Sequence, residues 1–166
     1  MKNKEILKPI RLLALDIDGV LTDGKIFWVS GTGWTRTFCV ADGYGIKLLL
    51  KNGLDVAFLS GGDSESVRER AKWLKIPHVY LGDENKLIAL EKIQKETGLK
   101  DHEIAFVGDE LFDIPVLQRV GFSATVPHAP KEVKNVADYV TEREGGNGAV
   151  REICDLFLEI NGGFKI

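Results

Sequence analysis

The chain alternates short, continuous apolar runs with longer segments in which apolar residues recur at helical spacing. The apolar runs predict β-strands at residues 12–16, 55–60, 78–81, 104–108, 122–126 and 138–140. The helical segments predict α-helices at residues 43–52, 64–75, 85–97, 111–120, 130–136 and 147–159. Repeated strand–helix–strand units predict an α/β fold with a parallel sheet and right-handed crossovers. Val56–Leu59 and Ile104–Val107 contain no polar position, which is typical of strands buried on both faces.

Residues 25–40 break this alternation and predict an antiparallel hairpin. Two expected strands, Lys25–Val29 and Trp34–Val40, flank a turn of sequence SGTG. Both strands carry large apolar residues, and a lone two-stranded ribbon cannot hide both of its faces from water. We therefore expect the hairpin to pack against other copies of the chain. The alternative is that it folds back onto its own domain.

The first apolar run, Leu12–Leu15, leads directly into Asp16, Ile17, Asp18 and Gly19. Side chains two apart on a strand point the same way, so Asp16 and Asp18 are expected to face one spot. Two carboxylates this close repel each other and are costly to desolvate, and a divalent cation is the usual remedy. Gly19 then allows a sharp turn. The alternative is a strand that simply ends in a polar turn.

Ser60 and Asp109 also follow predicted strands, and ligands of such sheets bind at the carboxyl ends of the strands. The Ser60 hydroxyl and the N–H groups of Gly61 and Gly62 would form an oxyanion cradle, although the same residues fit an ordinary helix N-terminal turn. Lys86 begins a predicted helix, where the macrodipole does not favour a positive charge. This position indicates a role such as facing a phosphate, and the alternative is a solvated surface lysine.

Length and composition are those of one soluble domain, or of one domain with a small insert. The 166 residues are 44% apolar and 28% charged, with a net charge of −3. This charge, without a basic block, argues against nucleic acid as a partner. The two cysteines, Cys39 and Cys154, form neither a CxxC motif nor a cluster with histidine, which suits a reducing cytosol. We expect neither a signal peptide nor a membrane span.

The sequence DIDGVLTDG at residues 16–24 resembles the first motif of the haloacid dehalogenase-like phosphatases. More closely, it resembles the 3-deoxy-manno-octulosonate 8-phosphate phosphatases and their nonulosonate-phosphate relatives. The likeness covers about residues 10–160 and recurs in order as DGYGI, LSGG, NKL, GDELFD and GGNGAVRE. It implies a Rossmann-like three-layer parallel sheet with a hairpin insert at 25–40 and no separate cap domain. Residues 1–166 would form one such domain, in which 145–166 supply a glycine-rich entry, the last helix and a tail.

The same resemblance implies phosphoryl transfer to a carboxylate. Asp16 would attack phosphorus and form an aspartyl-phosphate, while Asp18 would protonate the leaving sugar oxygen and then activate water. A Mg²⁺ ion would be held by Asp16, Asp109 and the backbone carbonyl of Asp18. Asp113 would ligate this ion through water or brace the lysine of the site. The remaining phosphoryl oxygens would be held by Ser60, Gly61 and Lys86.

Two further motifs supply candidate substrate-binding residues. Asp42 lies in DGYGI, which is expected to be a turn into the first helix. Arg151 lies in GGNGAVRE, whose glycines predict a flexible entry to the last helix. Relatives use this C-terminal region near a neighbouring active site, so Arg151 is a candidate anion contact. Its alternative is an exposed helix-start residue paired with an acid.

The chain departs from its relatives at positions that bear on the substrate. Close relatives often carry arginine where Ala41 and Gly62 stand here, and both changes remove a planar group suited to a sugar carboxylate. Glu110 replaces the usual second aspartate of the fifth motif. Arg68 and Arg70 would compensate if they faced the site, although such helix residues are more often solvated.

The leading interpretation is a magnesium-dependent phosphatase of a phosphorylated 3-deoxy-2-keto sugar acid, with the eight-carbon 8-phosphate as first choice and a nonulosonate 9-phosphate as second. The resemblance also implies a cytoplasmic homotetramer of lipopolysaccharide biosynthesis. Two other classes stay open. One is a receiver-like domain phosphorylated on aspartate as a signal, and the other is a binding module that keeps the fold without turnover. Catalytic release of phosphate from p-nitrophenyl phosphate separates the enzyme from both.

Overall fold

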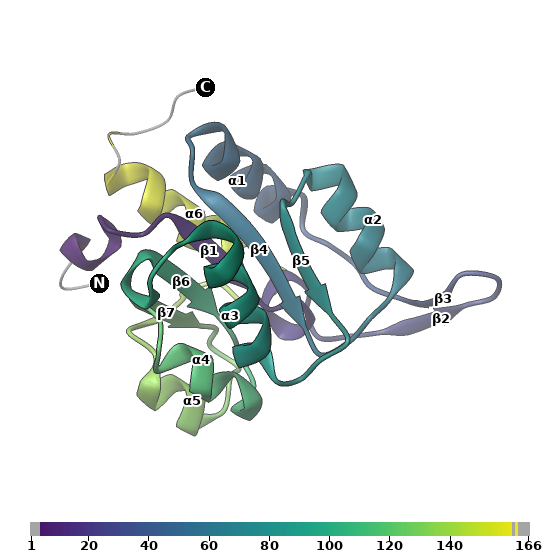
Figure 1. Ribbon diagram of the computed structural model, residues 1–166. Helices are drawn as coiled ribbons and strands as arrows, with labels where there is room; N and C mark the ends of the chain where they lie inside the picture. Colours follow the sequence, from purple (N-terminus) through teal and green to yellow (C-terminus); the bar gives the residue numbers. More distant parts are fainter. Residues whose placement is uncertain (1–3, 161, 163–166) are drawn as a thin grey trace.

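The computed structural model describes residues 4–160 and 162, and a parallel sheet forms the centre of the molecule (Figure 1). Its strands lie in the order β5 (His78–Leu81), β4 (Asp55–Ser60), β1 (Leu12–Leu15), β6 (Ile104–Val107), β7 (Phe122–Thr125) and β8 (Tyr139–Val140). Every pairing within this sheet is parallel. The predicted strands are therefore confirmed, and each end falls within one residue of its expected place.

Helices cover both faces of the sheet, so that the fold has three layers. Along β1, Leu12 and Ala14 belong to one apolar core, whereas Leu13 and Leu15 belong to the other. The first core is closed by α3 (Lys86–Thr97), α4 (Ile114–Leu117) and α5 (Lys131–Val136). The second is closed by α1 (Val40–Lys51), α2 (Glu65–Leu74) and α6 (Ala149–Ile160). Burial of the central strands on both faces explains their continuous apolar runs, and the expected three-layer α/β fold is confirmed.

The first helix, α1, begins at Val40, earlier than predicted, so the expected turn at DGYGI is wrong. The two glycines of DGYGI lie inside α1, where they allow close packing and do not form a turn. A Cβ at Gly43 would lie 2.3 Å from Nη2 of Arg70, and one at Gly45 would lie 2.9 Å from Cδ of Arg151. The predicted helix 111–120 is also shorter, because a 3₁₀ turn at Leu111–Asp113 precedes the short α4.

The predicted hairpin is present, with shorter strands than expected, as β2 (Phe27–Val29) and β3 (Gly33–Thr35). Residues 36–39, expected to continue the second strand, instead lead back to the body of the molecule. The ribbon projects away from the sheet (Figure 1), and the Trp28 and Trp34 rings pack edge to face with centroids 5.4 Å apart. Both tryptophans are more than half exposed, so the hairpin does not bury its apolar faces on its own domain.

Among residues 4–160 and 162, no helix combines the length and apolar character that a membrane crossing requires. The predicted cytoplasmic location stays a prediction. The predicted C-terminal tail lies outside the described residues apart from Gly162, as do residues 1–3 of the predicted domain.

Candidate active site

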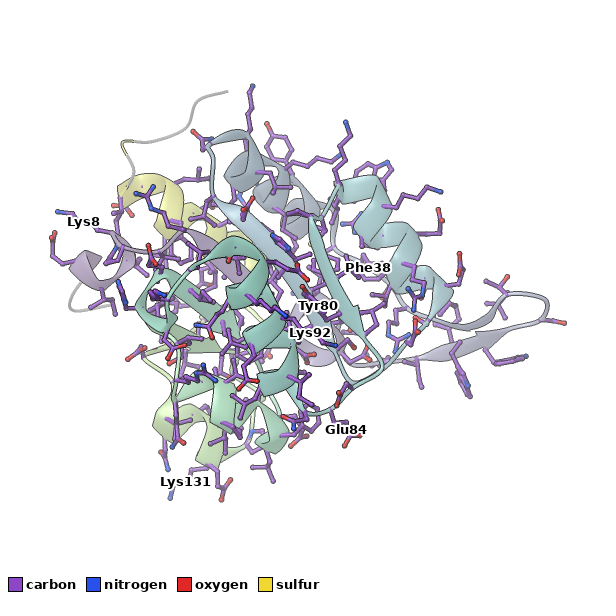
Figure 2. The ribbon with its side chains drawn as sticks, viewed as in Figure 1. Lys8, Phe38, Tyr80, Glu84, Lys92 and Lys131 are labelled. Carbon is purple, nitrogen blue, oxygen red and sulfur yellow. The ribbon has the colours of Figure 1, made fainter. Side chains whose placement is uncertain are left out.

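The candidate site lies where three neighbouring strands end. Asp16 follows β1 and its N–H donates to the Val107 carbonyl at 2.9 Å, Ser60 ends β4, and Asp109 comes shortly after β6. Because β4, β1 and β6 are adjacent and parallel, their carboxyl ends meet at one rim. Glu84, labelled in Figure 2, lies beyond the ends of β4 and β5 at the same edge. The topology thus brings Asp16, Ser60 and Asp109 to one edge, as their positions in the sequence predicted.

Three carboxylates converge at this rim. Asp16, Asp109 and Asp113 each offer an oxygen, and these oxygens lie within 4.8 Å of one another. Burial raises the pKa of Asp16 well above its usual value, with Lys86 opposing the rise and Asp113 adding to it. Burial likewise raises the pKa of Asp109 to about 6. Oδ1 of Asp109 is buried and accepts no hydrogen bond from the described residues. Such a cluster is costly unless a cation shares it.

Lys86 lies inside the site and its side chain is only 1% exposed. Its Nζ is 2.7 Å from Oδ1 of Asp16 and 2.5 Å from Oδ1 of Asp113. Burial lowers the pKa of Lys86, but the two carboxylates together outweigh burial and leave the pKa above its usual value. The ammonium therefore stays charged, and the alternative of a solvated surface lysine is wrong.

Asp113 organises the loop that carries Asp109. Its Oδ2 accepts the N–H groups of Asp109 at 3.0 Å and Glu110 at 3.1 Å, while its Oδ1 accepts from Lys86. A Cβ at Gly108 would lie 2.6 Å from Cγ of Asp113, so this position leaves room only for glycine. The predicted contact of Asp113 with Lys86 is present, and its other predicted role, as a ligand through water, stays a prediction.

The chain turns sharply directly after Asp16, through a π-helical turn at Ile17–Leu21. Gly19 takes a φ of +95° in this turn, and a Cβ there would lie 2.0 Å from Oδ2 of Asp109. Oγ1 of Thr22 donates to the Ile17 carbonyl at 3.1 Å and so closes the turn. The predicted role of Gly19 is confirmed, with the addition that its missing side chain lets Asp109 approach.

The Asp18 side chain does not join the cluster of Asp16, Asp109 and Asp113, because the strand alternation that would align it with Asp16 stops at Leu15. Its carboxylate is held by Arg36, with Nε 2.5 Å from Oδ1 and Nη2 2.7 Å from Oδ2. The expectation that both side chains face one spot is therefore corrected. Sequence reasoning missed Arg36, which it placed in a hairpin strand, and no local pattern marks it.

Ser60 and Gly61 form a tight turn between β4 and α2. The Ser60 side chain is buried, and its hydroxyl accepts the N–H of Gly62 at 3.2 Å. A Cβ at Gly61 would lie 2.9 Å from Cγ of Glu84, so the glycine leaves room for that side chain. The expected phosphate contacts of Ser60 and Gly61 stay predictions.

The side chain of Asp42 contacts the backbone of Arg151, and neither residue joins the acidic cluster. The carboxylate of Asp42 is fully buried and accepts the N–H groups of Arg151 at 2.7 Å and Gly148 at 3.4 Å. It therefore ties α1 to the start of α6, and its predicted contact with substrate is not supported. The Arg151 guanidinium pairs with Asp155 at 2.8 Å, which matches the alternative expectation of a helix-start residue paired with an acid. A contact between Arg151 and substrate stays a prediction.

The glycine pair before α6 packs directly on the turn after β1. A Cβ at Gly145 would lie 1.7 Å from the Gly19 carbonyl oxygen, and Gly146 donates its N–H to the Val20 carbonyl at 3.0 Å. These glycines therefore serve close backbone approach, which corrects the expectation of a flexible entry.

Gly145→Ala is expected to lower the free energy of unfolding by about 3 kcal/mol, the upper range for overpacking, and, by displacing Gly19, to reduce the phosphatase activity that the resemblance implies. Urea unfolding and phosphate release measure the two effects. Gly53→Ala is the control, because no atom lies within 4 Å of a Cβ there and its φ of +82° adds only local strain. Equal stability and activity of the two variants would contradict the close approach.

Comparison with known proteins agrees with this site. The sequence model of a family described as haloacid dehalogenase-like hydrolase matches residues 49–153. The 3-deoxy-D-manno-octulosonate 8-phosphate phosphatase of Escherichia coli is 43% identical over 153 residues, which cover 92% of this chain and 81% of that protein.

Solved structures are similar to this chain in both fold and sequence. The phosphatase of that name from Yersinia pestis superposes with a TM-score of 0.93 at 36% identity, covering 98% of this chain and 90% of its own. The Moraxella catarrhalis phosphatase, crystallised with a magnesium ion, a phosphate ion and a KDO molecule, gives a TM-score of 0.91 at 39% identity, with coverage of 94% and 90%. The chain is thus a phosphoric monoester hydrolase whose described residues form no separate cap domain, and it belongs to the 3-deoxy-D-manno-octulosonate 8-phosphate phosphatase family of the haloacid dehalogenase-like hydrolases.

Proposed function

We propose that this phosphatase hydrolyses 3-deoxy-D-manno-octulosonate 8-phosphate through an aspartyl-phosphate on Asp16, with Mg²⁺ as cofactor. The observation that carries the mechanism is the buried cluster of Asp16, Asp109 and Asp113, which Lys86 closes on one side. The choice of substrate and metal is supported by the name of the Escherichia coli relative and by the ligands of the Moraxella catarrhalis complex.

The donor set suits a hard cation. Asp16 and Asp109 offer carboxylate oxygens, and Oδ1 of Asp109 has no other partner among the described residues. We assign the backbone carbonyl of Asp18 as the third protein ligand, and waters would complete the six oxygens that magnesium prefers. When bound, the ion offsets the repulsion between carboxylate and phosphate and polarises a phosphoryl oxygen.

The residues of the chain then divide the chemistry. An oxygen of Asp16 forms a bond to phosphorus as the bond to the sugar oxygen breaks, and Asp18 gives its proton to that oxygen. Asp18 next takes a proton from a water whose oxygen displaces Asp16 from phosphorus, which restores both groups. Lys86, Ser60 and Gly61 hold the other phosphoryl oxygens while negative charge spreads over them.

One feature of the sequence keeps a second substrate, a nonulosonate 9-phosphate, open. Ala41 and Gly62 provide no guanidinium where close relatives often carry one. Phosphate release should be compared for the eight-carbon 8-phosphate, a nonulosonate 9-phosphate and glucose 6-phosphate. We expect the highest kcat/KM for the first. A higher value for the second would select the alternative, and no preference over glucose 6-phosphate would refute both.

Magnesium is expected to raise the melting temperature by about 5–10 °C at one hundred times its Kd, because binding to the folded state alone adds about 2.7 kcal/mol. Asp109→Asn should largely remove this shift by weakening the site, whereas Asp55→Asn, at the opposite end of β4, should retain it. Differential scanning fluorimetry with and without magnesium measures the shift. An unchanged shift in Asp109→Asn would exclude this residue as a ligand.

We further propose that residues 1–166 form one domain in which residues 25–40 are an insert, and that the hairpin joins copies of the chain into a homotetramer. Its exposed apolar side chains support this proposal, because an isolated ribbon leaves them in water. Sedimentation velocity should show an oligomer that Trp28→Lys dissociates. Trp73→Lys, at an equally exposed tryptophan on α2, is the control. A monomeric wild-type protein would refute the assembly.

A further inference from the structure

Arg36 is bound to Asp18 more completely than a surface arginine would be. Two of its N–H groups bind the two carboxylate oxygens, and a third, on Nη1, donates to Oγ of Ser64 at 2.8 Å. Two parallel hydrogen bonds fix both the place and the plane of a carboxylate, which a single bond does not. The Arg36–Asp18–Ser64 set therefore ties the end of the hairpin, the turn after β1 and the start of α2 together.

The two members of the pair differ in their exposure to solvent. The Arg36 side chain is only 7% exposed, whereas that of Asp18 is 36% exposed. Arg36 therefore lies behind the carboxylate, and each oxygen of Asp18 keeps a lone pair directed away from the guanidinium. The exposed side of Asp18 is therefore the side that a substrate can reach, while Arg36 holds the carboxylate from behind.

Gly62 leaves the space in which this arrangement forms. A Cβ at Gly62 would lie 3.3 Å from Nη2 of Arg36 and 3.6 Å from Oδ2 of Asp18. A long side chain at position 62 would crowd the Arg36 guanidinium and the Asp18 carboxylate. The glycine in the turn after β4 and the arginine after β3 therefore fit each other.

We propose that Arg36 is the positioning residue for the acid–base group Asp18, holding its carboxylate where the leaving oxygen of the substrate arrives. This inference rests on the proposed role of Asp18 and extends it to a residue that nothing in the sequence motifs marks. It has a specific consequence. A leaving alcohol needs the proton of Asp18 as its bond to phosphorus breaks, whereas p-nitrophenolate leaves without one.

The decisive experiment compares Arg36→Met with wild type on two substrates. For the sugar acid phosphate, we expect kcat to fall by about 10–100-fold, less than the roughly 10²–10⁴-fold that complete loss of acid catalysis costs, with KM changed by less than about threefold. For p-nitrophenyl phosphate, the burst of nitrophenolate, which reports attack by Asp16, should stay within about threefold of wild type. Arg36→Lys should recover part of the lost kcat, since one bond to Asp18 can re-form.

A double-variant cycle separates positioning from a general structural effect. Because Arg36 acts through Asp18, Asp18→Asn with Arg36→Met should be no slower than Asp18→Asn alone. Additive losses, or equal losses on both substrates, would overturn the proposal. Should Arg36→Met fold poorly, Ser64→Ala removes the anchor of Nη1, together with the contact between the Ser64 and Ser66 hydroxyls, and should show a smaller loss on the sugar acid phosphate alone. Full activity of Asp18→Asn on that substrate would instead refute the proposed function itself.

Discussion

Asp16→Asn is expected to lower kcat for p-nitrophenyl phosphate by about 10⁴-fold or more, because an amide cannot replace a carboxylate as the nucleophile. The isosteric side chain should not disturb the fold. Lys86 keeps its partner Asp113 at 2.5 Å, and one of three crowded carboxylates is removed. Burial already raises the pKa of Asp16 well above its usual value, so its neutral replacement is well tolerated.

Rapid mixing with p-nitrophenyl phosphate tests this expectation. Wild type should release a burst of nitrophenolate and carry a phosphoryl group that intact-protein mass spectrometry detects, whereas Asp16→Asn should show neither. Asp55→Asn is the matched control, since this exposed aspartate lies at the other end of β4. Turnover at the wild-type rate by Asp16→Asn would exclude Asp16 as nucleophile, whatever the substrate. Catalytic turnover by wild type would also exclude the receiver-like and binding-only alternatives.

The sequence predicts the sheet and its rim because β1, β4 and β6 are buried on both faces. Each strand is a short run with almost no polar residue, so the polar residues on either side mark where the strand begins and ends. Polar residues directly after such runs must then lie at the carboxyl edge of a parallel sheet. This reasoning predicts that Asp16, Ser60 and Asp109 share one edge. Lys86 is indicated by its unfavourable place at a helix start together with the order of the family motifs.

Contacts between distant turns are what the sequence does not reveal. The period of two that aligns Asp16 with Asp18 holds only while the strand continues, and the strand ends at Leu15. Gly19 then redirects the backbone with its φ of +95°. The partner of Asp18 is Arg36, eighteen positions away, brought there by the length of the hairpin. No periodicity of apolar residues records such a pairing.

Glycines were misinterpreted for a related reason. In DGYGI and in GGNGAVRE they look like turn residues, because positive φ is the usual need for glycine. Gly43 and Gly45 are instead helical residues that admit arginine side chains, and Gly145 admits the Gly19 carbonyl. The need for glycine at these places comes from what lies opposite in space, which the local sequence does not contain.

Lys86→Met is expected to damage stability and catalysis together, because the same ammonium neutralises Asp16 and Asp113 and is proposed to bind phosphate. Removing one partner of a buried ion pair costs about 3–5 kcal/mol, since the remaining charges are left in a medium that does not solvate them. Loss of a contact to the phosphoryl group in the transition state should lower kcat by a further factor of about 10²–10³. Urea unfolding and phosphate release measure the two losses separately.

The matched control is Lys92→Met on the same helix, α3, where the side chain is exposed (Figure 2) and the free energy of unfolding should change by no more than about 0.5 kcal/mol. A second variant identifies the cause. Adding Asp113→Asn to Lys86→Met removes one of the two carboxylates that lost their cation, so the double variant should regain part of the stability while its kcat stays low. A double variant less stable than Lys86→Met would contradict unneutralised charge as the main cause of the lost stability.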